Sequence, residues 1–166
     1  ERFIRDAADD PGTTTIKMTV YRLGDDTPFV RSLIKAAENG KQVACLVELK
    51  ARFDEERNLH WAEELQKAGD HVIYGFRGLK THTKLALVVR KEGDGLRSYA
   101  HIGTGNYHVK TARMYTDFGL FTCDPVLTRD VVTLFHHLTG YSRSPRFEKL
   151  LVAPLNMRTR FVDLIA

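Results

Sequence analysis

The sequence is short of cysteine and has no long hydrophobic run, and each absence excludes a class of protein. Its 166 residues include 2 cysteines, Cys45 in an apolar stretch and Cys123 beside an Asp-Pro pair. Their spacing indicates neither a disulfide framework nor a metal site, and is typical of a protein in a reducing compartment. No apolar run approaches the ~20 residues of a transmembrane segment. No signal-peptide pattern opens the sequence.

The composition is that of one globular domain with a modest positive charge. Hydrophobic residues make up 43% and charged residues 28%, with a net charge of +4. That charge favours anionic partners, but it does not distinguish nucleic acid from polyphosphate or nucleotide. The sequence begins with Glu1 rather than methionine and stops at Ala166 within a predicted helix. We therefore expect it to be a piece of a longer protein.

Strands and helices are predicted to alternate along the chain. A strand, helix, strand, helix, strand series is typical of a parallel or mixed sheet covered by helices, so the predicted fold class is α/β. Helical spacing places Leu59, Ala62 and Leu65 on one face of the second helix. Strands are predicted at 13–22, 42–49, 71–76, 80–90, 96–102 and 115–123, and helices at 27–39, 54–67, 124–140 and from Asn156 onward.

An imidazole stands between two lysines at the start of the fourth predicted strand. The sequence reads GLKTHTK from Gly78 and continues into the apolar run 85–89. Because side chains two apart in a strand share a face, we expect Lys80, His82 and Lys84 to project together. The lysines can neutralise an anion and lower the pKa of the imidazole, which keeps its lone pair free to attack. The alternative is a basic strand end whose histidine is merely exposed.

A glycine-rich loop is predicted to return beside this histidine. The Asp-Gly turn at 92–95 predicts a hairpin whose second strand ends in Gly103-Thr104-Gly105-Asn106. Two glycines let the backbone approach a ligand closely, and Thr104 and Asn106 offer groups that can hydrogen-bond phosphate oxygens. We therefore expect His82, Lys84 and Asn106 to converge.

These motifs resemble a known family. His82-x-Lys84 followed by Gly103-Thr104-Gly105-Asn106 resembles the HxK and GSxN half-site of the phospholipase-D-like superfamily. The longer strings GLKTHTKLALVVR and YAHIGTGNYHVKTARMYTD, with VELKARFDEE upstream, closely resemble the polyphosphate kinases that use a phosphohistidine intermediate. The acidic residue that the superfamily carries a few positions after the lysine is replaced by an apolar run around Val89. This departure disfavours phosphodiesterase chemistry.

The resemblance implies a fold, a reaction and a set of site residues. The fold is a phospholipase-D-like mixed β-sheet flanked by helices. The implied enzyme is an ATP:polyphosphate phosphotransferase that would transfer the γ-phosphoryl group of ATP reversibly to polyphosphate, with Mg²⁺ as cofactor and ATP as substrate. The residues implied are His82 as the phosphohistidine nucleophile and Lys84 as its catalytic partner; Lys80, Thr104 and Asn106 for phosphate; Tyr115 for the nucleotide; and Arg22 and Arg52 for the metal.

The two arginines need a chemical qualification. A guanidinium is always protonated and has no lone pair for a cation. If Arg22 and Arg52 belong to a magnesium site, either backbone carbonyls hold the ion, or phosphate oxygens that the arginines also grip do so.

A second HxK pattern, His108-Val109-Lys110, has no apolar strand after it and is disfavoured as the nucleophile. His101 lies near the glycine loop and is predicted to support the site by contacting its residues rather than the ligand.

The resemblance further implies an incomplete site. Residues 1–153 would form the first of two half-site domains, and 154–166 would connect to a C-terminal domain, so we expect the isolated chain to be inactive. Its expected partners are ATP or ADP, polyphosphate and the rest of a longer, homo-oligomeric chain, with no nucleic acid. The expected location is cytoplasmic, with peripheral membrane association also open. Two alternatives remain: a phospholipase-D-like phosphodiesterase or nuclease half-site, and a non-catalytic anion-binding module.

Overall fold

The computed structural model of the chain describes residues 1–21, 28–48, 55–75, 79–142 and 144–166. Arg22 and Arg52, expected at a magnesium site, lie outside this part. Within it, six strands form one sheet in the order β3-β2-β1-β4-β5-β6. The strands are β1 Thr13–Val20, β2 Gln42–Val47, β3 His71–Tyr74, β4 Lys84–Glu92, β5 Gly95–Gly103 and β6 Gly119–Thr122. The helices are α1 Arg2–Asp9, α2 Pro28–Glu38, α3 Glu55–Lys67, α4 Val109–Ala112, α5 Pro125–Leu138 and α6 Met157–Ile165.

The sheet is mixed, and its strand directions bring the ends of all six strands that matter for the site to the same end of the sheet. Strands β1, β2 and β3 run parallel, whereas β4, β5 and β6 pair antiparallel with their neighbours. The carboxyl ends of β1, β2, β3 and β5 therefore meet the amino ends of β4 and β6 at the same edge. Lys84 pairs with Gly103 there, and Gly103 pairs with Gly119. The mixed α/β sheet expected from the sequence is confirmed.

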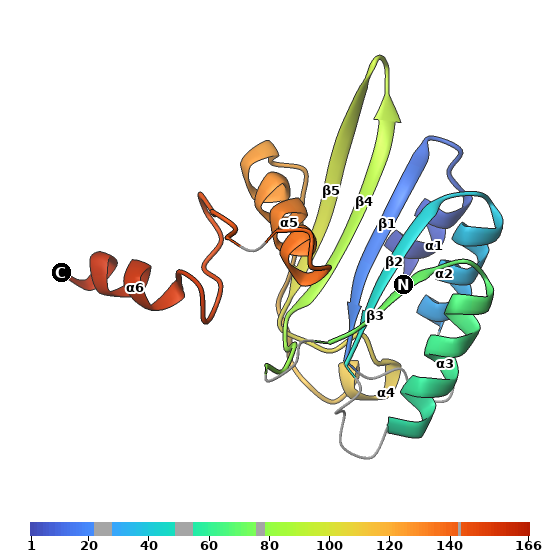
Figure 1. Cartoon of the computed structure of the whole chain (residues 1–166), viewed down its shortest axis with the longest axis horizontal. Helices are drawn as coiled ribbons and strands as arrows, with labels where there is room; N and C mark the ends of the chain where they lie inside the picture. The colour runs from blue at the N-terminus through green and yellow to red at the C-terminus, as the bar shows by residue number, and fades with distance from the viewer. Residues whose placement is uncertain (22–27, 49–54, 76–78, 143) are drawn as a thin grey trace.

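Helices cover both faces of the sheet because its central strands are apolar on both sides. Helices α1, α2 and α3 lie on one face and α5 lies on the other, while α6 extends away from the sheet (Figure 1). Strand β4 divides its side chains between the two layers, with Ala86 and Val88 under the first group of helices and Leu85 and Leu87 under α5. This alternation is the two-residue period of a strand.

Helix α5 holds the chain that follows it. Its cap, Asp124, accepts hydrogen bonds from the backbone N–H groups of Val126 and Leu127 at 3.1 and 2.8 Å. The buried carboxylate of Asp130 accepts three further backbone hydrogen bonds, from Glu148, Lys149 and Leu150. These bonds keep the segment that contains Leu150 and Val152 packed against the α5 layer.

The structure corrects four sequence-based expectations. Helix α1 was not predicted; its apolar residues Ile4, Ala7 and Ala8 are few, and packing against α2 completes it. Leu59 is 46% exposed rather than on the inner face of α3. Strand β4 begins at Lys84, so Lys80 and His82 precede it, and β6 begins at Gly119 rather than Tyr115.

Asp70 is a buried carboxyl group that should make stability depend on pH. It is 6% exposed, and neither carboxylate oxygen has a hydrogen-bond partner among the described residues. Burial raises the pKa of Asp70 from 3.8 to about 7. Because the folded chain binds this proton more tightly than the unfolded chain does, stability should fall as pH rises from about 4 to about 7.

Asp70→Asn should therefore raise the free energy of unfolding by on the order of 4 kcal/mol above pH 7, and by a vanishing amount near pH 4. Urea denaturation at pH 4, 6 and 8 measures this difference. Asp94→Asn, in the exposed turn of the β4–β5 hairpin, is the matched control and should leave the pH dependence unchanged. An equal gain for Asp70→Asn at pH 4 and pH 8 would exclude titration as the cause.

Candidate active site

The backbone around His82 is fixed, although the side chain is exposed. The Thr19 hydroxyl donates to the carbonyl of Thr83 at 2.8 Å and accepts from the N–H of Leu85 at 3.0 Å. The Lys84 ammonium donates to the carbonyl of His82 itself. The N–H of Thr81 donates to the Glu48 carboxylate at 2.9 Å. The segment therefore presents an accessible imidazole from an anchored main chain.

Lys84 is the closest partner of the imidazole. The lysine is 4% exposed, and its Nζ lies 3.0 Å from Nδ1 of His82. A charged ammonium can only donate, so Nδ1 accepts and Nε2 carries the ring hydrogen in this arrangement. Partial burial and the ammonium groups of Lys84 and Lys80 lower the pKa of His82, which favours the neutral ring. Burial also lowers the pKa of Lys84, and the nearby Asp117 opposes that shift.

The ring of Tyr21, the residue after β1, lies close to three predicted site residues: Lys80, His82 and Lys84. The Nζ atoms of Lys80 and Lys84 lie 5.0 and 5.8 Å from the ring centroid. The ring of His82 meets it edge-on at 5.8 Å. The tyrosine face can therefore stabilise two ammonium groups that would otherwise repel each other. This role of Tyr21 was not predicted, and its one signal in the sequence is an aromatic residue immediately before Arg22.

Glycines at the end of β5 and the start of β6 leave space for the ring of His101. A Cβ atom on Gly103 or Gly119 would lie 2.9 or 2.6 Å from the ring of His101, so these glycines make room for that imidazole. The Nδ1 atom of His101 lies 2.8 Å from the hydroxyl of Tyr107. His101 therefore packs against the glycine loop, and its role in supporting the site stays a prediction.

Asp117 occupies the corresponding space over Gly105. Its carboxylate accepts a hydrogen bond from the Thr104 hydroxyl at 3.0 Å, so this predicted phosphate ligand already has a protein partner. Asn106 has a buried Oδ1 atom with no hydrogen-bond partner among the described residues. Asp117 was missed from the sequence, where it is the last residue of the second long motif.

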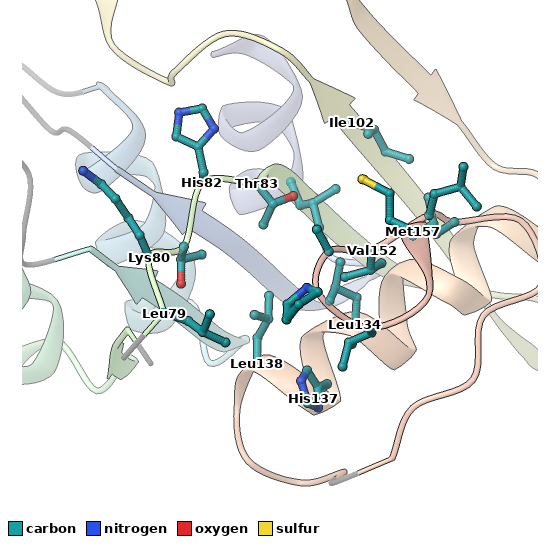
Figure 2. Close-up of a pocket in the computed structure, with 17 residues that line it drawn as sticks. Leu79, Lys80, His82, Thr83, Ile102, Leu134, His137, Leu138, Val152 and Met157 are labelled. Atoms are coloured by element: carbon teal, nitrogen blue, oxygen red, sulfur yellow. The ribbon is translucent and has the colours of Figure 1, made fainter. Parts of the chain in front are cut away.

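Four of the predicted residues line two separate cavities. Lys80 and His82 line a cavity of about 530 Å³ whose opposite wall, seen in Figure 2, is apolar and includes Leu134, Leu138 and Val152. Asn106 and Tyr115 line another cavity, of about 660 Å³. Lys84 contacts His82 and also interacts electrostatically with Asp117, a residue of the second cavity. Lys84 therefore interacts with one residue of each cavity, His82 and Asp117.

Two further candidate residues, Tyr115 and His108, lie next to the short helix α4. Tyr115 is 69% exposed in the loop after α4, with its ring open to a ligand. His108 caps α4, with its Nδ1 accepting from the N–H of Thr111 at 3.2 Å. That contact gives the second HxK pattern a structural role.

Mg²⁺ prefers several oxygen ligands in near-octahedral geometry. Among the described residues, no group of three or more His, Cys, Asp or Glu side chains could hold a metal ion. The side chains that the structure describes therefore do not form a complete magnesium site.

Proteins of low sequence identity share this fold. Nuc from Salmonella typhimurium, a phospholipase D family member, is 14% identical with a TM-score of 0.62, over 88% of this chain and 90% of that chain. NucT from Helicobacter pylori is 11% identical with the same TM-score, over 84% and 87% of the two chains. The fold is therefore phospholipase-D-like, as expected.

Closer similarity identifies the family within that fold. Residues 1–144 match the model of polyphosphate kinase C-terminal domain 1, so the chain belongs to the polyphosphate kinase family. It is 62% identical to a polyphosphate kinase of Synechocystis sp., over 99% of this chain but 23% of that relative. The crystal structure of polyphosphate kinase from Porphyromonas gingivalis is 38% identical with a TM-score of 0.87, over 99% of this chain and 27% of that chain.

The chain thus spans about a quarter of the length of the relatives it matches. The family resemblance expected from the motifs is confirmed. In the described part of the chain, no helix is both long enough and apolar enough to cross a membrane.

Proposed function

We propose that this domain carries the phosphohistidine half-site of a polyphosphate kinase, which transfers the γ-phosphoryl group of ATP to polyphosphate through His82. The observation that carries the proposal is the exposed imidazole on an anchored backbone, 3.0 Å from the ammonium of Lys84. Such a group can attack phosphorus, and the adjacent cations can neutralise the phosphate oxygens.

The transfer proceeds in two steps. A nitrogen lone pair of His82 forms a bond to the γ-phosphorus while the bond to the β,γ-bridging oxygen breaks and ADP leaves. A terminal oxygen of polyphosphate then attacks the phosphohistidine and returns the imidazole. Because Lys84 contacts Nδ1 in the free domain, an incoming phosphate should draw the ammonium to its own oxygens and release the ring.

The remaining residues would position the polyanions. Lys80 lies beside His82, and Asn106 and Tyr115 share a cavity that could take the phosphates and base of a nucleotide. Thr104 would exchange its bond to Asp117 for a phosphate oxygen. Arg22 and Arg52 follow β1 and β2 in the sequence, at strands whose carboxyl ends lie on the site edge, and would grip phosphate as bidentate donors. Mg²⁺, when bound with the nucleotide, would neutralise phosphate charge.

The half-site would be completed by the rest of the longer chain. Residues 1–153 would form the first of two half-site domains and 154–166 the connection to the next. The family model ends at residue 144, and α6 has no buried residue, which supports a boundary in this region. A phosphoryl transfer site requires charge from both sides of the transferring group and exclusion of water.

Labelling with [γ-³²P]ATP tests the proposal. The full-length protein should acquire acid-labile ³²P on the peptide that contains His82 and should make acid-insoluble polymer. The isolated 166-residue chain should make no polymer. Polymer synthesis by the isolated chain would contradict the two-half-site arrangement, and label on another residue of the full-length protein would contradict the assignment of His82.

A further inference from the structure

We propose that Glu48 is a positioning residue, whose buried carboxylate sets the location of His82 by holding the backbone immediately before it. The inference rests on the proposed function of His82. Glu48 directly follows β2 and is 4% exposed. Its Oε2 atom accepts a hydrogen bond from the N–H of Thr81 at 2.9 Å. Thr81, itself buried, is the residue before His82.

The base of the Glu48 side chain is itself immobilised. The N–H of Glu48 donates to the carbonyl of Val20 at 2.9 Å, which extends the pairing of β2 with β1. The carbonyl of Glu48 accepts from Nδ2 of the fully buried Asn58 at 3.0 Å, and the same amide donates to the carbonyl of Tyr21 at 3.1 Å. The carboxylate is therefore attached to a rigid junction of β1, β2 and α3.

The carboxylate also lies against the end of β3. A Cβ atom placed on Gly75 would lie 3.8 and 3.9 Å from the two oxygens of Glu48, which is ordinary van der Waals contact. Gly75 and Thr81 are the described residues near the two ends of the connection from β3 to His82. Glu48 thus holds one end of that connection through Thr81 and lies near the other end at Gly75.

The three anchors of the segment are not equivalent. Thr19 fixes Thr83 and Leu85, which follow His82, and Lys84 fixes the carbonyl of His82. Glu48 is the anchor on the amino-terminal side. A hydrogen bond to a charged acceptor is about twice as strong as one between neutral groups. Its loss should let the backbone from Leu79 to His82 move relative to Lys84 and Tyr21.

Catalysis should be sensitive to this movement, because a misplacement of about 1 Å can cost about 10²-fold in rate. Glu48→Met keeps the length of the side chain but removes the acceptor, so phosphohistidine formation in a single turnover should fall about 10²-fold. The KM for ATP should stay within about threefold, since Glu48 need not contact substrate. Glu48→Gln keeps an oxygen acceptor and should remain within about tenfold of the wild-type rate.

Hydrogen–deuterium exchange of the full-length protein provides the second readout. The peptide that covers Leu79 to Lys84 should exchange faster in Glu48→Met and at nearly the wild-type rate in Glu48→Gln. Glu63→Met, at an exposed position of α3, is the matched control and should change neither exchange nor labelling. A merely structural role would not separate the Met and Gln variants while leaving KM unchanged.

The outcomes separate this inference from the proposed function. If wild-type protein acquires no label on His82, the proposed function fails, and the exchange data still test the bond from Glu48 to Thr81. If His82 is labelled but Glu48→Met exchanges and labels like wild type, the positioning role is wrong. If Glu48→Met loses protection throughout β1 and β4, the Gln variant decides: a folded Gln protein as slow as about 1% of wild type would overturn the inference, and a nearly normal one would support it.

Discussion

His82→Ala should abolish acid-labile ³²P labelling of the full-length protein and reduce polymer synthesis by at least about 10³-fold. The reason is that His82 presents its imidazole beside the ammonium groups of Lys84 and Lys80. The fold should survive, because the His82 side chain is exposed and belongs to neither apolar core. Labelling with [γ-³²P]ATP, peptide mapping and circular dichroism measure the three quantities.

His108→Ala is the matched control, since His108 belongs to the other HxK pattern. It should remove the cap of α4 but leave the label on His82 present. Label that survives His82→Ala and disappears in His108→Ala would show that His108, not His82, is the nucleophile.

Lys84→Met should lower phosphohistidine formation by about 10²–10³-fold. The substitution keeps the buried stem of the side chain and removes the ammonium that lies against Nδ1 of His82. It also removes a positive charge that lowers the pKa of His82, so that pKa should rise. The loss of rate should therefore be accompanied by an upward shift of the pH at which labelling begins. A pH profile of single-turnover labelling measures both effects.

Lys91→Met makes the same charge change at the exposed far end of β4 and should leave the rate and the pH profile unchanged. Folding should not explain a defect in Lys84→Met, because burial already disfavours the charged lysine. A Lys84→Met protein with normal labelling would exclude the ammonium from the transfer step.

The strands and helices of the central sheet follow from local patterns in the sequence. The apolar run after Lys84 predicts β4, and the Glu92-Gly93-Asp94-Gly95 turn predicts its pairing with β5, because such a turn determines the register of a hairpin. The observed partners Lys84 and Gly103 follow directly. Helix α1 was missed because a short helix depends on packing against neighbouring elements more than on its own residues.

The segment before β4 shows where a local rule fails. Alternation predicted that Lys80, His82 and Lys84 would share one face of a strand, but regular pairing starts only at Lys84. At this point the Thr19 side-chain hydroxyl donates to the carbonyl of Thr83 and accepts from the N–H of Leu85. The three side chains still gather, but around the ring of Tyr21 rather than on one side of a strand.

The sequence by itself determined the family, the α/β sheet and the hairpin of β4 and β5, because long motifs, apolar periods and hairpin turns are encoded by neighbouring residues. That Lys84 is the partner of Nδ1 of His82 came only from the structure. The tertiary structure decided which distant groups hold the site. Glu48 reaches Thr81 across 33 positions and Thr19 reaches Thr83 across 64. It also decided that the glycines accommodate His101 and Asp117. Such contacts depend on how whole strands and helices pack, and no spacing within one segment specifies them.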